Sequence, residues 1–140
     1  AFHISTNAGE TPRALARIAS GGEISRVMLA LKEAIAGRDL VSILVFDEID
    51  SGISGRIAAA VGRKMQALSA SHQTIAITHL PQIASLADQH FSVRKKQIKQ
   101  RTITEVVALD EKARTEEIAY LLAGEIVSDT ARQHAQEMLR

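Results

Sequence analysis

Two short apolar segments, separated by an amphipathic one, constrain the fold of this chain more than any other feature. Residues 41–46 (VSILVF) and 74–78 (TIAIT) are rich in β-branched and aliphatic side chains, which is typical of strands buried on both faces. Between them, apolar residues recur at the spacing of one helical face: Ile57, Val61, Met65 and Leu68. Strand, helix and strand in succession predict an α/β fold, in which helices flank a mostly parallel sheet.

Further elements are expected on both sides of this unit. Residues 1–6 are predicted to form a short strand that ends at a turn over residues 7–9. A helix that stops at Gly37 is predicted to have these residues on one face: Ile24, Val27, Met28, Leu31 and Ile35. After the second strand we expect a short helix from Pro81 to Ala87, a strand from Phe91 that pairs with residues 101–109, and helices over residues 115–123 and from Ser128 onward.

Composition bounds the size and class of the protein. A chain of 140 residues with 46% apolar and 24% charged side chains can form one folded core, which excludes wholesale disorder. The absence of cysteine excludes disulfides, thiolate zinc sites and cysteine nucleophiles, and it suits a reducing cytosol. No apolar run approaches the roughly 20 residues that a membrane span needs, and the first residues show no signal-peptide pattern, so no membrane partner is expected.

Net charge gives no sign of nucleic-acid binding, because 17 basic residues stand against 16 acidic ones. A contact to a polyanion must therefore come from a local patch. The notable group of like charges lies at the predicted hairpin turn: Arg94, Lys95, Lys96, Lys99 and Arg101. We interpret this group first as the solvated tip of a hairpin. The alternative is a contact to DNA phosphates.

Two acidic residues, Asp47 and Glu48, directly follow the strand predicted over residues 41–46. Two acids after a hydrophobic strand form the Walker B pattern of nucleotide-hydrolysing proteins. The first carboxylate then holds Mg²⁺, directly or through water, and the second orients or deprotonates a water molecule. A solvated turn of sequence DEID is the alternative.

A pair of glycines precedes the helix that is predicted near Ile24. The sequence there is Ser20, Gly21, Gly22 and Glu23. Glycines allow a ligand to approach the backbone closely, and the start of a helix offers free N–H groups and a positive dipole end, which together suit a phosphate. An ordinary N-cap serine in a flexible turn is the alternative interpretation.

A histidine, His79, follows the second predicted strand directly. A neutral imidazole at the carboxyl end of a strand can donate a hydrogen bond to a phosphate oxygen. In open α/β sheets ligands bind beyond these strand ends, so His79 and the acid pair are expected at one edge of the sheet. For a histidine taken alone, a purely structural role is the alternative.

The order of these motifs resembles the second half of an ABC-type ATPase, with a signature motif, Walker B, a D-loop and a switch histidine. More narrowly, the chain resembles the carboxyl-terminal part of the RecN family, the bacterial SMC-like DNA-repair ATPases. The segments that carry this resemblance span essentially the whole chain: ISTNAGE, IASGGEISRVMLALK, LVFDEIDSGISGR, ITHLPQIASLADQHFSV and KARTEEIAYLLAG.

The resemblance implies a role for each motif. Asp47 would be the magnesium-associated acid, Glu48 the general base and His79 the residue that senses the γ-phosphate. The signature residues Ser20, Gly21 and Gly22 would contact ATP bound to a second head. Glu23 stands where transporters commonly have glutamine, a change shared by SMC-like proteins. Residues 50–54 occupy the D-loop position, where Ser54 departs from the aspartate of many transporters.

No GxxxxGK[ST] motif occurs in the sequence, so we do not expect the chain to bind ATP tightly by itself. The resemblance then implies that residues 1–140 are the carboxyl-terminal lobe of an ATPase head, with the Walker A lobe and a coiled coil outside it. The implied cofactors are ATP and Mg²⁺. The implied partners are that amino-terminal lobe, a second head and, through the full-length protein, DNA in the bacterial cytoplasm close to the nucleoid.

Two other classes of protein are weighed against this hypothesis. The sequence Asp47-Glu48-Ile49-Asp50 fits a DExD-box helicase, but that class explains neither the glycine pair nor the THLPQ segment. A non-catalytic head that serves only for dimerisation or as a DNA scaffold is the other alternative. The motifs all retain chemically competent residues, which argues against decay.

Overall fold

The computed structural model describes residues 3–5, 9, 11–14, 20–38, 40–98 and 101–140. It divides into two compact units, Ala1–Thr78 and His79–Arg140, which are described separately. Both units combine helices with strands, so the prediction of an α/β protein is confirmed in its coarse form. The predicted turn at residues 7 and 8 lies outside the described residues. None of the helices in the described segments is long and apolar enough to cross a bilayer.

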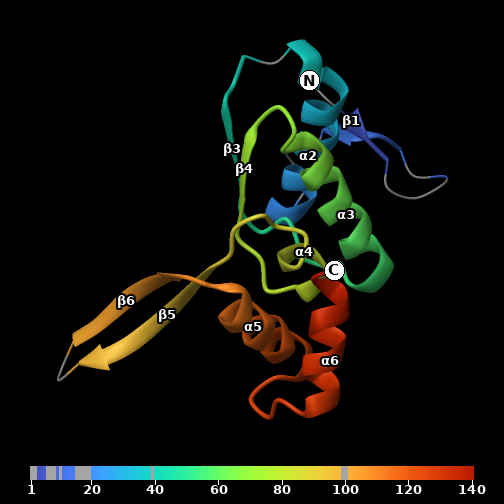
Figure 1. Ribbon diagram of the computed structural model, residues 1–140. Helices are drawn as coiled ribbons and strands as arrows, with labels where there is room; N and C mark the ends of the chain where they lie inside the picture. Colours follow the sequence, from blue (N-terminus) through green and yellow to red (C-terminus); the bar gives the residue numbers. More distant parts are fainter. Residues whose placement is uncertain (1–2, 6–8, 10, 15–19, 39, 99–100) are drawn as a thin grey trace. The chain divides into compact units, whose positions relative to one another are not determined.

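The first unit is built around the predicted strand–helix–strand element (Figure 1). Strands β3 (Ile43–Phe46) and β4 (Gln73–Ala76) pair in parallel, with Val45 opposite Ile75, and helix α3 (Gly55–Leu68) connects them. Helix α2 (Gly21–Ile35) precedes β3 and is followed by the short 3₁₀ helix η1 (Ala36–Arg38). Strands β1 (His3–Ile4) and β2 (Arg13–Ala14) form a separate antiparallel pair.

A mostly parallel sheet is not confirmed. Among the described residues one strand pair is parallel, and the other two pairs, β1–β2 and β5–β6, are antiparallel. A parallel sheet needs a crossover connection for each added strand. The described residues supply one such crossover, through α3, whereas the later strands follow each other directly as a hairpin.

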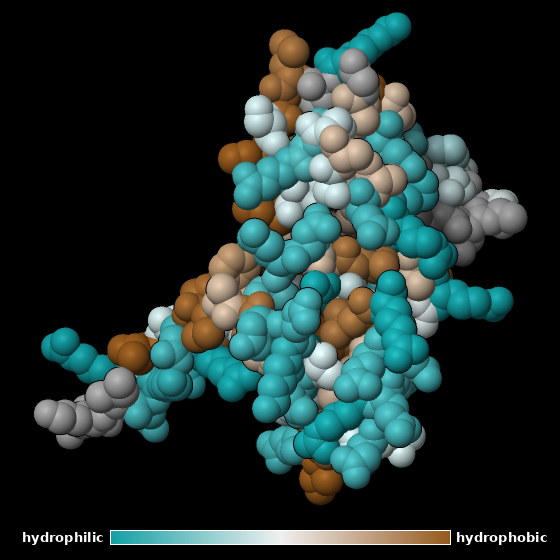
Figure 2. Space-filling view, viewed as in Figure 1, coloured by the Kyte–Doolittle hydropathy of each residue, from teal (hydrophilic) through white to brown (hydrophobic). Residues whose placement is uncertain are grey.

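Burial of β3 on both faces is a wrong prediction for this chain. Leu44 and Phe46 are buried, but Ile43 is 53% and Val45 63% exposed, and Ile75 on β4 is 45% exposed. Successive side chains of a strand point to opposite faces, so one face of this pair lies on the core and the other faces solvent. Figure 2 shows hydrophobic surface along β3. We call Ile43, Val45 and Ile75 the open sheet face.

Helix α2 also buries a different face from the predicted one. Its inner residues are Gly22 and Leu29, whereas Val27 is partly buried and four of the predicted inward residues are exposed by 39–49%: Ile24, Met28, Leu31 and Ile35. We call these four exposed residues the outer stripe of α2. On α3 the inner face is largely as predicted, with Val61, Met65 and Leu68 buried, but Ala58 replaces Ile57, which is 59% exposed. Lys64 of α3 forms an ion pair with Glu33 of α2 at 2.6 Å.

The second unit is a hairpin beside three helices. Helix α4 (Pro81–Ala84) is shorter than predicted, and strands β5 (Phe91–Ile98) and β6 (Arg101–Ala108) form the predicted antiparallel hairpin, with Phe91 opposite Ala108. Helices α5 (Glu111–Ala123) and α6 (Asp129–Met138) complete it. Its core consists of these buried residues: Ala84, Ile118, Ala119 and Ala135.

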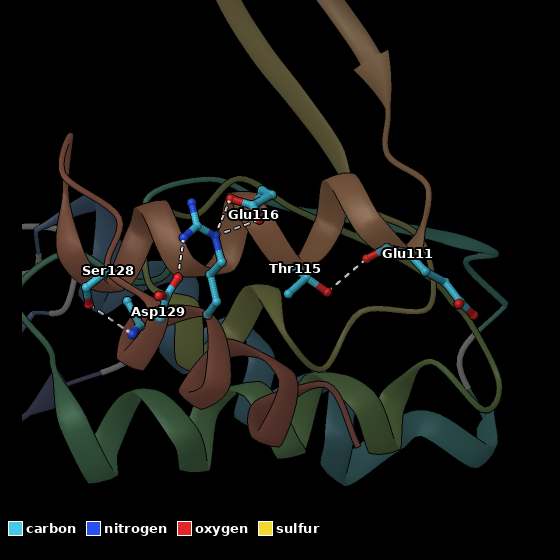
Figure 3. A network of polar contacts seen from close by, with 7 residues as sticks. Glu111, Thr115, Glu116, Ser128 and Asp129 are labelled. Carbon is cyan, nitrogen blue, oxygen red and sulfur yellow. Dashed lines mark hydrogen bonds and ion pairs between the residues drawn. The ribbon is translucent and has the colours of Figure 1, made fainter.

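Capping fixes where the last two helices begin. The Asp110 carboxylate accepts a hydrogen bond from the Ala113 N–H, so α5 begins at Glu111, earlier than the predicted residue 115. Ser128 caps α6 in the same way through the Ala131 N–H. Figure 3 shows Glu116 on α5 and Asp129 on α6 near one guanidinium group, which belongs to Arg132. The Nε of Arg132 lies 2.9 Å from Glu116 Oε1, and its Nη1 lies 3.0 Å from Asp129 Oδ1. The pair with Glu116 joins the two helices, and the pair with Asp129 lies within α6.

Candidate functional site

The glycine-led start of α2 is a capped helix end. The Ser20 hydroxyl accepts a hydrogen bond from the Glu23 N–H at 3.3 Å, and the Ser20 N–H donates to Glu23 Oε2 at 3.0 Å, which is a capping box. The N-cap interpretation of Ser20 is therefore confirmed as its local role, and Glu23 is its capping partner. A phosphate role for these residues stays a prediction.

Both glycines lie against residues 47–51, the turn that carries the acid pair, which we call the acid turn. A Cβ at Gly22 would lie 2.7 Å from the Glu48 carbonyl oxygen and 2.8 Å from Ser51 Cβ, and a Cβ at Gly21 would collide with Glu48 Oε2. Glycine is thus required at position 22 by the approach of the chain's own backbone, whereas the neighbour of Gly21 is the end of a side chain. The structure brings together the predicted signature residues and the predicted Walker B acids, which lie apart in the sequence.

The acid pair follows β3 as predicted, and both residues are exposed. Asp47 Oδ1 accepts a hydrogen bond from the Glu48 N–H at 2.9 Å, and the Asp47 carbonyl accepts one from the Ser25 hydroxyl at 2.8 Å. Glu48 has φ +55°, in the left-handed region that non-glycine residues rarely adopt. Backbone strain of this kind is found preferentially at functional sites.

A magnesium ion would find limited protein coordination here. The described residues contain no group of three or more His, Cys, Asp or Glu side chains that could hold a metal. Mg²⁺ in nucleotide sites is typically bound by one or two carboxylates together with water and substrate phosphates. The exposed Asp47 carboxylate at a strand end fits that donor set.

The segment that follows β4 is joined to residues 50–54, the predicted D-loop position. Thr78, the last residue of the first unit, donates a hydrogen bond from Oγ1 to Asp50 Oδ2 at 2.7 Å, and Asp50 is 5% exposed. His79 is exposed and begins the second unit, so the predicted proximity of its ring to the acid pair stays a prediction. Ser54 is the N-cap residue of α3 by position, although its side chain makes no capping hydrogen bond.

One residue of this site was missed by sequence reasoning. Arg26 of α2 donates hydrogen bonds from Nη1 to the carbonyl oxygens of Ile49, at 3.1 Å, and Ser51, at 2.8 Å. It lies four positions after Gly22, and residues four apart share a helical face. This four-residue spacing was the signal in the sequence, because it places Arg26 on the same face of α2 as Gly22. That face is the one turned toward the acid turn.

The basic residues of the hairpin are partly neutralised within the chain. Arg94 pairs with Glu117 at 2.7 Å and Lys96 with Glu105 at 2.5 Å. Lys95 and Arg101 are exposed, and neither forms an ion pair with another described residue. Lys99 lies outside the described residues. The prediction of a solvated hairpin is confirmed for these described residues, and DNA contact stays a prediction.

A histidine at the base of the hairpin has an unusual setting. His90 accepts the Leu109 N–H at its carbonyl oxygen, while its ring Nδ1 and the nearby Arg114 Nε are buried polar atoms with no hydrogen-bond partner among the described residues. Arg114 itself donates to the carbonyls of Ser85, at 2.9 Å, and Ala87. Burial lowers the pKa of His90 below its usual value, the Arg114 charge lowers it further, and Glu117 opposes both effects.

We expect the second unit to lose stability as the pH falls below about 6.5, the ordinary histidine pKa. The unfolded chain takes up a proton on His90 in that range while the folded chain does not, so protonation favours unfolding. The contribution of neutral His90 to the stability of the folded unit is complete above the ordinary histidine pKa. It is lost as the pH falls through the lower pKa that His90 has in the folded chain. Chemical denaturation at several pH values measures it. His90→Gln should flatten the pH dependence, whereas His134→Gln, at an exposed histidine of α6, should not. Equal slopes in all three proteins would contradict the assignment.

The fold of this chain is similar to that of a solved SMC ATPase structure. A solved structure described as "Structural biochemistry of ATP-driven dimerization and DNA stimulated activation of SMC ATPases" matches it with a TM-score of 0.56 at 22% identity, covering 85% of this chain and 71% of that one. No protein-family model matches the sequence.

The sequence relatives of this chain are RecN proteins. The chain is 45% identical over 138 residues to the DNA repair protein RecN of Halalkalibacterium halodurans, 43% identical over 139 residues to that of Bacillus subtilis, and 50% identical over 139 residues to that of Treponema pallidum. Each match covers 99% of this chain and 24% of the relative. The chain therefore spans about a quarter of the length of these relatives, and it matches the carboxyl-terminal part of RecN proteins over nearly its whole length.

Proposed function

We propose that this chain is the carboxyl-terminal lobe of the ATPase head of a RecN-like protein that acts in DNA double-strand break repair and recombination. The observation that carries this proposal is the packing of the signature glycines against the Walker B turn, where Gly22 leaves no room for a Cβ beside Glu48. The RecN relatives favour it over a DExD-box helicase, and the retained acids favour it over a non-catalytic scaffold.

In this proposal the two acids of the chain have different tasks. Asp47 would hold Mg²⁺, which offsets the charge of the ATP phosphates when it is bound. Glu48 would accept a proton from the attacking water, and its exposed position after β3 leaves its carboxylate open to solvent. His79 would donate a hydrogen bond to the γ-phosphate.

The remainder of the same polypeptide would supply the Walker A lobe. Two exposed apolar surfaces of the first unit support this partner: the open sheet face and the outer stripe of α2. Large exposed apolar surfaces commonly mark interaction sites, and sheets with parallel strands are normally covered on both faces. The chain alone would then have little ATPase activity.

A second head would complete each nucleotide site. The start of α2 would face ATP held by that second head, while Asp47 and Glu48 would serve the ATP of their own head. Because the γ-phosphate would be bridged only in the closed pair, ATP would favour the pair and hydrolysis would release it.

DNA is the remaining partner in the proposal, reached through the full-length protein. Among the described residues of the hairpin, Lys95 and Arg101 would be left to contact phosphates, since Arg94 and Lys96 are engaged with carboxylates of the chain, and Lys99 belongs to the same predicted group. A cytoplasmic location near the nucleoid follows from this partner.

Replacing Ser20 tests the proposal. In the full-length protein, Ser20→Arg should place a bulky side chain where the second head's ATP would approach, and it should abolish dimerisation induced by a non-hydrolysable ATP analogue. Ser128→Arg is the matched control, because Ser128 also caps a helix through the N–H three residues ahead. Both variants lose a cap worth about 1 kcal/mol. Sedimentation velocity measures the dimer, and an unaffected Ser20→Arg dimer would overturn the proposal.

A further inference from the structure

The start of α2 is held onto the acid turn by one arginine. Arg26 lies on the second turn of α2, and its Nη1 donates to two carbonyl oxygens, those of Ile49 and Ser51, at 3.1 and 2.8 Å. Ile49 is fully buried. A charged donor shared between two carbonyls fixes both the distance and the direction between the helix and the turn.

The surrounding contacts make this attachment tight. Ser25, the neighbour of Arg26, donates to the carbonyl of Asp47 at 2.8 Å. A Cβ at Gly22 would lie 3.0 Å from Arg26 Nη1, so the guanidinium also forms one wall of the space beside that glycine. On the other side of the turn, Asp50 accepts the hydroxyl of Thr78. The turn is thus fastened to α2 by Arg26 and to the end of β4 by Asp50.

We infer that Arg26 is a positioning residue, which sets the place of the signature glycines relative to Asp47 and Glu48. This inference rests on the proposed function. In a pair of heads the glycines would serve one nucleotide site and the acids the other, so Arg26 would couple the two sites through a single side chain. It would touch neither nucleotide.

Arginine suits this role better than other residues. Its planar guanidinium presents several donors in fixed directions, whereas a lysine ammonium is a compact charge on a flexible chain. A lysine at position 26 could satisfy a carbonyl but would fix the geometry less well. A methionine would keep much of the packing of the aliphatic chain and would leave both carbonyls without this donor.

The test compares four forms of the full-length protein: wild type, Arg26→Met, Arg26→Lys and Lys64→Met. For each form we would measure the affinity for ATP, the ATP-dependent dimer dissociation constant and kcat. In Arg26→Met we expect ATP affinity within about twofold of wild type, because the Walker A lobe would hold the nucleotide. Dimerisation and kcat should each fall by about tenfold or more, which is the signature of an interaction made only in the paired state.

Lys64→Met is the matched control. It also removes a cation that joins α2 to a neighbouring element, here through the ion pair with Glu33, but it lies away from the acid turn. All three of its measurements should stay within about twofold of wild type. Arg26→Lys should recover part of the lost dimerisation and of the lost kcat. If thermal unfolding shows that Arg26→Met does not fold, the comparison of Arg26→Lys with wild type becomes the test.

Three results would overturn the inference: normal dimerisation in the Arg26 variants, equal losses in Lys64→Met, or a loss of ATP affinity as large as the loss of kcat. The proposed function would instead be overturned by a wild-type protein that does not dimerise with ATP, or by a Ser20→Arg variant that dimerises like wild type, so the two failures are distinguishable.

Discussion

Glu48→Gln in the full-length protein is expected to slow ATP hydrolysis by about 10²-fold or more, as loss of a general base does, while ATP-dependent dimerisation persists. The amide has nearly the shape of the carboxylate but cannot accept the proton of the attacking water. Glu48 is exposed directly after β3 and its backbone conformation, φ +55°, is available equally to glutamine. Steady-state turnover and sedimentation velocity with ATP measure the two properties.

Glu33→Gln is the control for this experiment. Glu33 is an exposed acid of the same unit and its known engagement is the ion pair with Lys64. Exposed pairs of this kind contribute little, about 0–1 kcal/mol, so its turnover should match wild type. Undiminished turnover in Glu48→Gln would remove Glu48 from the role of general base.

Gly22→Ala is expected to destabilise the first unit by about 2–3 kcal/mol, the upper range for forcing atoms into a filled space. The new Cβ would meet the Glu48 carbonyl oxygen at 2.7 Å and Ser51 Cβ at 2.8 Å, and a backbone carbonyl cannot move without shifting the acid turn. Alanine is otherwise the better helix former, so the expected loss runs against helix propensity. Urea denaturation measures the loss.

Gly21→Ala is the control that distinguishes the clash with the backbone of the acid turn from the mere addition of a methyl group to the helix. Its Cβ would collide with the end of the Glu48 side chain, which can rotate away. We therefore expect Gly21→Ala to cost less than about 1 kcal/mol. Equal losses of stability in both variants would show that the backbone of the acid turn moves aside as easily as the Glu48 side chain. Gly22 would then not be held tightly against that turn.

The order of elements was predictable from the sequence because local patterns determine it. The strand–helix–strand element follows from apolar runs that flank a helical period, and the hairpin follows from alternation around a basic turn. Asp47, Glu48 and His79 were proposed as site residues from their place after predicted strands; the acids do follow β3, whereas β4 ends at Ala76, before His79. Arg26 was not, since nothing in its neighbours shows which carbonyls it will meet.

The buried faces were predicted less well, for one shared reason. Hydrophobic periodicity shows which side chains are suited to burial but not which partner buries them. The outer stripe of α2 and the open sheet face have the pattern of buried surfaces and are exposed in this chain. The inner face of α2 is instead selected by Gly22, which is small enough to lie against the acid turn, and by Leu29.

The open sheet face also bears on how such a polypeptide is made. In the relatives the matching part is the carboxyl-terminal one, so during translation it leaves the ribosome last. Domains generally fold as units as they emerge, the amino-terminal ones first. If the Walker A lobe covers the open sheet face, as proposed, that lobe would already be folded when this face is synthesised. The isoleucine and valine side chains would then be covered soon after synthesis, instead of being available to other nascent chains.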